Sequence, residues 1–319
     1  MNPFGACIVI PVLNEETTIR DLVASVLTQT RPADEVLIVD GGSTDRTCAI
    51  VEELSDRGPV RLIRAGRAYP GEGRNLGARE AAHEVVAFTD AGVRLDDRWL
   101  EELCRPLEQD PSIEVVYGTY EPVLDSFFKE CAALAFVPAP IFRQGQRIRG
   151  PSVASCLIRK SVWKSVGGFP PYRAAEDLIF MDALERRGCS IAYASRAVAH
   201  WHIVPGWRAM FGRFATYSEH NLRAGWGRYW HLGVAKMYAA AALIALLAVT
   251  HSIWWLIVPM GGFAARVWLT AFRKRAAFGF TDVFRLKRLL YLAGLLLMMD
   301  GATMWGALRW VTGGSEKRA

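Results

Sequence analysis

Several short patterns that would indicate a particular kind of site are missing from this chain. Its six cysteines include no C-x-x-C pair and no ladder of short spacings, which argues against a zinc site and a disulfide framework. No G-x-G-x-x-G follows the first apolar run, and neither G-K-S nor G-K-T occurs, so a dinucleotide fold and a P-loop have no support. We therefore expect the cysteines to be buried free thiols in a reducing compartment.

The beginning of the chain also lacks the features of a targeting segment. No basic region precedes the first apolar run, and Pro11 interrupts that run after a few residues. A secretory signal would need a basic region followed by about 7–15 apolar residues. We expect no cleaved signal, and we expect the first part of the chain to lie in the cytoplasm.

The composition is rich in apolar residues without being poor in charge. Of the 319 residues, 51% are hydrophobic and 22% are charged, which argues against a disordered protein and against a bundle made only of membrane helices. The length allows about two domains at roughly 100–200 residues each. The formal net charge of +6 favours anionic partners, such as nucleotides, anionic lipid or nucleic acid.

Apolar runs of strand length alternate with amphipathic stretches in the first two thirds of the chain. The runs cover residues 6–10, 36–39, 60–63 and 85–88. This alternation predicts an α/β fold with parallel strands, crossover helices and helices on both faces of the sheet. Ligands of such sheets lie at the carboxyl ends of the strands, where Asn14, Asp40 and Asp90 are expected.

Three long apolar stretches follow residue 232. They cover residues 233–249, 252–272 and 289–310, and each is close to the about 20 residues that a helix needs to cross the hydrocarbon layer. A buried core helix is the alternative for any one of them. Three in succession favour a transmembrane region over residues 232–319.

The loop between the second and third stretch is strongly basic. Arginines and lysines gather there against a single acidic residue, Asp282. The positive-inside rule places this loop in the cytoplasm. If the first two stretches form a hairpin, the N-terminal domain lies on the same side, and a third span would carry the C-terminus outside unless it is re-entrant. Lys317 and Arg318 argue against that export.

Residues 205–231 join the two parts and have an amphipathic pattern. Aromatic residues recur at helical spacing, with Arg208 and Arg213 off that stripe. Two interpretations are open, a helix packed in the protein core or an interfacial helix in the plane of the lipid headgroups. The position directly before an apolar stretch favours the interfacial helix.

Five motifs occur in an order that carries a resemblance. In chain order they read IPVLNEE, VDGGSTDRT, GEGRNLGARE, VAFTDAGVRLDD and VGGFPPYRAAED. The set resembles the inverting GT-A glycosyltransferases of family 2, over about residues 6–220. The resemblance implies a GT-A catalytic domain with a Rossmann-like mixed sheet over residues 1–204, followed by the amphipathic segment and the membrane helices.

The resemblance implies a pocket for a nucleotide sugar. Its lining would include Pro11, Leu13 and Glu15. Asp40 would read the base, and Arg74 would lie near the base or the phosphates. The residues alone allow two alternatives, a turn or helix-capping aspartate at position 40 and a solvated arginine at a helix end at position 74.

The resemblance also implies a divalent metal, Mg²⁺ or Mn²⁺, that bridges the diphosphate of the donor. Asp90 would contact the donor through this metal as the first acid of an Asp-x-Asp motif, and His200 could complete the metal site. Gly92 replaces the second acid of the motif, so the dependence on metal is open. A surface or interface histidine is the alternative interpretation of His200.

Two acids that follow the last motif are the candidate catalytic residues. By the resemblance, Asp177 is the base that takes the proton from an acceptor hydroxyl, and Glu176 supports it or contacts the acceptor. Without the resemblance, two acids in the first turn of a helix are explained by the helix dipole. A phosphate acceptor would already be ionised and would need no base.

Together these features predict a membrane-anchored inverting glycosyltransferase of the hexosyltransferase type with a UDP or GDP donor. The acceptor is expected to be a lipid-linked glycan or a polyprenyl phosphate in cell-envelope or exopolysaccharide synthesis. We expect a multi-pass protein of the inner (plasma) membrane with a cytoplasmic catalytic domain, and no nucleic-acid partner, because the positive-inside rule explains the basic residues. The alternative is a catalytically degenerate relative that binds a nucleotide sugar or a partner subunit.

Overall fold

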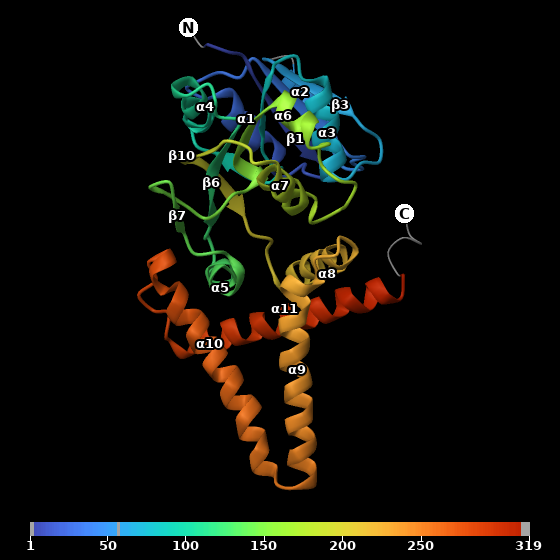
Figure 1. Cartoon of the computed structure of the whole chain (residues 1–319), viewed down its shortest axis with the longest axis vertical. Helices are drawn as coiled ribbons and strands as arrows, with labels where there is room; N and C mark the ends of the chain where they lie inside the picture. Colours follow the sequence, from blue (N-terminus) through green and yellow to red (C-terminus); the bar gives the residue numbers. More distant parts are fainter. Residues whose placement is uncertain (1–2, 56–57, 314–319) are drawn as a thin grey trace. The chain divides into compact units, whose positions relative to one another are not determined.

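The chain divides into two compact units, whose elements Figure 1 labels. The computed structural model describes residues 3–55 and 58–313. The first unit consists of Met1–Val123 with Pro140–His202, and the second of Leu124–Ala139 with Ile203–Ala319. The outer limits of the predicted domains, residues 1 and 319, and the tail residues Lys317 and Arg318 lie outside the described residues.

A mixed eight-stranded sheet in the order β3-β2-β1-β4-β9-β6-β10-β5 forms the centre of the first unit. The strands are β1 (Ala6–Val12), β2 (Glu35–Asp40), β3 (Val60–Arg64), β4 (Val85–Phe88), β5 (Val93–Leu95), β6 (Val115–Val123), β9 (Cys156–Arg159) and β10 (Ile191–His202). β9 is antiparallel to β4 and β6, β5 is antiparallel to β10, and the other neighbours are parallel. The predicted α/β fold with a mixed sheet is confirmed.

Helices cover both faces of this sheet because its central strands are apolar on both sides. They are α1 (Ile19–Leu27), α2 (Thr47–Ser55), α3 (Pro70–Glu80), α4 (Trp99–Gln109), α6 (Lys160–Ser165) and α7 (Glu176–Arg187). In β1, Ile8 and Ile10 belong to the cluster that includes α1 and α4, whereas Val9 belongs to the cluster that includes α3 and α7. Successive side chains of a strand point to opposite faces, so β1 is buried on both. A short hairpin, β7 (Ile141–Arg143) with β8 (Gln146–Ile148), and the 3-10 turn η1 (Val153–Ser155) complete the unit.

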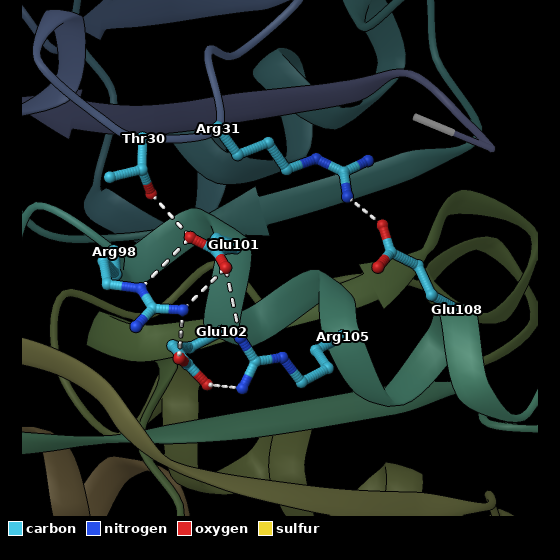
Figure 2. A network of polar contacts seen from close by, with 7 residues as sticks. All are labelled: Thr30, Arg31, Arg98, Glu101, Glu102, Arg105 and Glu108. Carbon is cyan, nitrogen blue, oxygen red and sulfur yellow. Dashed lines mark hydrogen bonds and ion pairs between the residues drawn. The ribbon is translucent and has the colours of Figure 1, made fainter. Parts of the chain in front are cut away.

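Charged side chains hold α4 in place, as Figure 2 shows. Glu101 accepts hydrogen bonds from Arg98 and from the hydroxyl of Thr30, and the bond from Arg98 is the main reason that the pKa of Glu101 falls to about 2. Further along the helix, Arg31 forms an ion pair with Glu108. Because Thr30 and Arg31 lie between α1 and β2, these contacts tie that loop to α4.

All six cysteines are free thiols, as expected. Cys7, Cys104, Cys131 and Cys156 are buried, and the other two are half-buried. None of them takes part in a disulfide, so the stability of the fold rests on packing and hydrogen bonds.

The second unit is made of helices. They are α5 (Phe127–Phe136), α8 (Trp207–Arg223), α9 (Gly227–Thr250), α10 (Ile257–Phe278) and α11 (Leu286–Val311), with the 3-10 turn η2 (Ile253–Leu256) between α9 and α10. Among the residues that the structure describes, three segments are long and apolar enough to cross a membrane, namely Trp230–Thr250, Ile253–Phe278 and Leu286–Val311. They correspond to the three predicted apolar stretches.

α8 occupies most of the predicted amphipathic segment. Met210 and Phe214 are buried, whereas Arg208 and Arg213 are exposed. The ring of Phe214 packs edge-on against Phe136 of α5, with 5.2 Å between the ring centroids. The buried part of the apolar stripe therefore packs within its own unit, whereas Trp207 and Tyr217 of the same stripe are exposed.

Candidate functional site

The loops that follow three adjacent parallel strands meet at one edge of the sheet. β1 lies between β2 and β4, with Val12 in register with Asp40 and Val9 in register with Phe88. Leu13 and Glu15 follow β1, Asp40 ends β2, and Asp90 comes two residues after β4. The carboxyl ends of parallel strands are where such sheets bind ligands.

Asp40 shapes the loop that follows it. Its buried carboxylate accepts hydrogen bonds from the backbone N–H groups of Gly42 (3.1 Å) and Ser43 (3.1 and 3.2 Å). A Cβ at Gly41 would lie 2.6 Å from the carbonyl oxygen of Ala68, so only glycine fits there. The structure thus displays the turn aspartate that the residues alone suggested, and base recognition by Asp40 stays a prediction.

The loop after β1 is hydrogen-bonded to the loop after β2. The side-chain oxygen of Asn14 accepts from the N–H of Thr44 (2.8 Å), and the N–H of Glu15 donates to the hydroxyl of Thr47 (2.7 Å). Asn14 adopts φ 56°, a left-handed conformation that asparagine tolerates better than most residues. These bonds hold Glu15 at the strand edge and leave Leu13 exposed.

A buried arginine joins carboxyl groups from distant parts of the chain. The guanidinium of Arg74, on α3, donates to Asp90 Oδ1 (2.5 Å) and to Glu176 Oε1 (3.0 Å). The side chain of Arg74 is only 5% exposed, which excludes a solvated helix-end arginine. Three of the predicted site residues therefore converge on one point, although Glu176 lies 102 positions after Arg74.

Glycines allow α3 to bring Arg74 to this point. A Cβ at Gly77 would clash with Val9 of β1, and a Cβ at Gly73 would come within 3.1 Å of Pro11. The helix therefore packs closely against the strand that carries the predicted pocket residue Pro11. Pro70 in the first turn and the bond from the N–H of Tyr69 to Glu72 (2.7 Å) define where this helix begins.

Asn75 positions the segment that leads to the acidic pair. Its amide donates to the carbonyl of Phe169 (2.7 Å) and accepts from the N–H of the same residue (2.8 Å). The motif GEGRNLGARE contains this asparagine, but the sequence interpretation assigned no role to it. The adjacent Arg74 was the signal that could have drawn attention to it.

Glu176 and Asp177 begin α7 directly after a strained residue. Ala175 has φ 68°, a left-handed conformation that non-glycine residues rarely adopt and that is often found at functional sites. Glu176 is buried, Asp177 is half-buried, and one Asp177 oxygen accepts from the N–H of Leu178 (2.8 Å). Both acids thus lie in the first helical turn, where the dipole favours negative charge.

One guanidinium faces three carboxyl groups in this cluster. Although burial favours its neutral form, Asp90 and Glu176 raise the pKa of Arg74. Burial raises the pKa of Glu176 to about 7 and also raises the pKa of Asp177, and the attraction of Arg74 only partly opposes this. A carboxyl group whose pKa lies near the working pH can take up a proton efficiently.

Replacing Glu176 with Gln is expected to change the pH dependence of stability. The raised pKa means that the folded protein binds more protons than the unfolded chain between pH 4.5 and about 7, so the wild type loses stability as the pH rises through this window. The Gln variant lacks this loss. Between pH 5 and pH 8 the midpoint of thermal unfolding should therefore fall less in the Gln variant than in the wild type, and equal falls in the two proteins would contradict the prediction.

His200 lies apart from Asp90 in its contacts. Its Nε2 atom is 2.6 Å from Asp96 Oδ1, whereas Asp90 is bonded to Arg74. Within residues 3–55 and 58–313, no group of three or more His, Cys, Asp or Glu side chains could hold a metal ion. Metal binding by Asp90 together with His200 stays a prediction.

The chain nevertheless has a second carboxylate near the place of the missing acid. Gly92 has φ 72°, and a Cβ there would lie 3.7 Å from Glu15 Oε2. Magnesium is commonly bound by one or two carboxylates together with substrate phosphates and water. Asp90 is half-exposed, so its carboxylate is accessible to a metal that arrives with a diphosphate.

Comparisons with known proteins agree with the sequence motifs. Residues 7–163 match the family "Glycosyl transferase family 2". The succinoglycan biosynthesis protein ExoA of Rhizobium meliloti (strain 1021) is 26% identical over 283 residues, which cover 82% of this chain and 83% of that protein. The poly-beta-1,6-N-acetyl-D-glucosamine synthase of Staphylococcus epidermidis is 24% identical over 213 residues, 63% of this chain and 50% of that protein. The chain thus spans about half the length of this synthase.

One solved structure is similar over nearly the whole chain. It is the mannosyltransferase PcManGT from Pyrobaculum calidifontis in complex with GDP-Man and Mn²⁺, with a TM-score of 0.57, 18% identity, and coverage of 98% of this chain and 88% of that one. At this identity the similarity concerns the fold, which is the GT-A arrangement expected from the motifs.

Proposed function

Because the chain belongs to glycosyltransferase family 2, we propose that it is a membrane-anchored inverting enzyme that transfers a sugar from a UDP or GDP donor to a membrane-associated acceptor. The observation that carries the proposal is the Arg74 cluster, in which Asp90 and Glu176 meet one buried cation and Asp177 lies in the adjacent position. This cluster provides carboxyl groups of raised pKa beside the strand edge that binds ligands in such folds.

The donor would bind across the loops after β1, β2 and β4. Pro11, Leu13 and Glu15 would line the nucleotide, and Asp40 would hold the loop against the base through its bonds to Gly42 and Ser43. The +6 net charge supports an anionic donor. The similar mannosyltransferase carries GDP-Man, and UDP remains the other nucleotide proposed.

Asp90 and Glu15 would hold a divalent cation together with the phosphates of the donor. Bound there, Mg²⁺ or Mn²⁺ neutralises charge on the leaving nucleotide diphosphate. Arg74 keeps Asp90 oriented before the donor arrives, since its guanidinium is buried and its bond to Asp90 spans 2.5 Å. The single acid at the motif implies weaker metal binding than two acids would give.

Asp177 is proposed as the catalytic base. It takes the proton of the acceptor hydroxyl while that oxygen forms a bond to the anomeric carbon of the sugar, and the bond from this carbon to the diphosphate oxygen breaks. Attack from the face opposite the leaving group inverts the anomeric centre. Glu176 keeps Arg74 in place through a hydrogen bond of 3.0 Å, and its proposed role is to support Asp177 or to contact the acceptor.

The acceptor is proposed to be a lipid-linked glycan or a polyprenyl phosphate at the cytoplasmic face of the inner membrane. Three apolar segments long enough to cross a bilayer support attachment to a membrane. The similarity to proteins of succinoglycan and poly-N-acetylglucosamine synthesis supports a role in cell-envelope or exopolysaccharide synthesis.

A thermal-shift screen of the detergent-purified chain tests the donor and the metal together. A bound donor stabilises the folded state by about 2.7 kcal/mol at one hundred times its Kd, so UDP or GDP sugars should raise the unfolding midpoint in a concentration-dependent way. Mn²⁺ should enlarge the shift without producing one by itself, because the cation is held jointly with the phosphates. Absence of any shift, together with absence of turnover with lipid extract and Mg²⁺ or Mn²⁺, would exclude the proposed function.

A second candidate function is that of a nucleotide-sugar-binding or partner-binding subunit without catalysis. Gly92 in place of the second motif acid favours it, since one ligand of the metal that would stabilise the leaving diphosphate is missing. Such a protein would give the thermal shift without turnover, in the wild type and in the Asp177→Asn variant alike.

A further inference from the structure

α11 does not run alongside α9 and α10. Figure 1 shows α9 and α10 as the two arms of a long hairpin, with α11 lying across them. The carboxylate of Asp300, in the middle of α11, accepts from Tyr238 of α9 (3.0 Å) and from Arg266 of α10 (2.9 Å to Oδ1). One helix therefore touches both arms of the hairpin at the same level.

α8 packs beside α11 along most of its length. Near the start of α8, the ring of Trp207 lies 5.9 Å from that of Tyr291. Near its end, the hydroxyl of Ser218 donates to the carbonyl of Thr303 (2.7 Å), and a Cβ at Gly306 would collide with the backbone of α8. The two helices therefore run in the same direction and form a paired layer.

Ion pairs hold both ends of α11 against neighbouring parts of the same unit. At its beginning, Arg288 pairs with Glu130 of α5 (2.9 Å) and with Asp282 (2.7 Å). At its end, Arg309 pairs with the buried Glu219 of α8 (2.8 Å). If α11 crossed the bilayer, α8 would have to enter the hydrocarbon with it, and charged side chains there are expensive to bury.

The side of α11 away from α8 carries an exposed apolar stripe. The large exposed side chains on this side are Leu286, Leu290, Leu297, Met304, Trp305, Leu308 and Val311, and the exposed Trp310 lies off this stripe. Steps of three, four and seven residues keep them on one helical face. The opposite face is buried, with Leu292, Leu295 and Ala302 within the protein. A helix with one packed face and one exposed apolar face suits a membrane surface.

The hairpin beyond α11 is free of charged residues. Residues 239–265 contain no Asp, Glu, Lys or Arg. The segment 239–250 extends about 18 Å beyond Tyr238 at 1.5 Å per residue. A helix in the interface lies about 5–10 Å deep at the boundary between headgroups and acyl chains. The depth of α11 and the length of segment 239–250 together approach the thickness of the hydrocarbon layer, which is about 30 Å. The exposed Trp254 and Trp255 at the turn would then meet the opposite interface, where tryptophan is enriched.

We infer that only the α9–α10 hairpin crosses the membrane and that α11 lies along the bilayer surface, with its apolar stripe in the lipid. The exposed Arg273, Arg275, Arg285 and Lys287 near its start face the anionic headgroups. Thr312, directly after α11, therefore stays on the side of the membrane from which α9 enters, and the third apolar stretch is not a span. The inference uses the membrane attachment in the proposed function but none of its chemistry.

Cysteine labelling in spheroplasts of a bacterial host tests this arrangement with the full chain. Two variants are compared, His251→Cys at the turn after α9 and Thr312→Cys directly after α11, both at exposed positions. A membrane-impermeant maleimide is applied before or after permeabilisation, and labelled peptides are identified by mass spectrometry. Cys7 and Cys156 are fully buried, so their protection in the permeabilised but undenatured sample reports that each variant is folded.

The expected result is that the cysteine at position 251 is labelled in intact spheroplasts and that the cysteine at position 312 is labelled only after permeabilisation. Labelling of position 312 from outside would overturn the inference, because α11 would then cross. Protection of both positions in intact spheroplasts would contradict a hairpin that crosses. Neither readout depends on transferase activity, so failure of the proposed function would leave this test intact.

Discussion

Replacing Asp177 with Asn is expected to reduce turnover by about 10²–10⁴-fold with a hydroxyl acceptor, which is the range that a positioned general base contributes. The amide keeps the size of the side chain but cannot take the acceptor proton. Because burial raises the pKa of Asp177, the wild-type group is suited to accept a proton near neutral pH. Turnover is measured at saturating donor, and the donor-induced thermal shift should be retained.

Asp182→Asn is the matched control for this variant. Asp182 lies on the same helix, but it forms an ion pair with the exposed Arg186 (2.8 Å) and has no contact with the Arg74 cluster among the described interactions. Its variant should turn over donor at the wild-type rate. Equal turnover of the Asp177 variant and the wild type with a hydroxyl acceptor would contradict Asp177 as the base, and absence of turnover in both proteins with the donor-induced thermal shift retained would favour the binding subunit.

Arg74→Met should destabilise the protein more than any exposed arginine variant. Removing one partner of a buried ion pair leaves the other charge unpaired, which costs about 3–5 kcal/mol. Glu176 is the partner left behind, and its side chain is only 7% exposed. At roughly 2–4 °C per kcal/mol for a domain of this size, the midpoint of thermal unfolding should fall by about 6–20 °C.

Two further variants separate the buried pair from a general effect of losing an arginine. Arg61→Met removes an exposed arginine that pairs with Glu35 (3.2 Å) and Glu80 (3.4 Å), and such surface pairs contribute about 0–1 kcal/mol. The double variant Arg74→Met with Glu176→Leu removes both buried charges and should recover part of the lost stability. No difference between the Arg74 and Arg61 variants, or no recovery in the double variant, would contradict the buried pair as the source of the effect.

The sequence named residues of the candidate site, but it did not predict how they are arranged in space. The ordered motifs named Arg74, Asp90, Glu176 and Asp177, and the structure brings Arg74, Asp90 and Glu176 into contact. Nothing in the local pattern indicated that Arg74 would be buried between two acids, because that depends on how closely α3 approaches β1. The contact of His200 was not predictable from the local pattern either, since its hydrogen-bond partner, Asp96, lies 104 positions earlier in the chain.

The kinds of element and their order follow from the local periodicity of the sequence. Strand-length apolar runs, amphipathic helices and three long apolar stretches are each written into a few neighbouring residues, and the structure contains all of them. The grouping of charges around Arg74 and the position of α11 across the hairpin came from the tertiary structure. Those outcomes depend on contacts between residues far apart in the chain, such as Arg74 with Glu176 and Asp300 with Arg266, and hydropathy alone cannot distinguish a helix that crosses a bilayer from one that is packed on one side and exposed on the other.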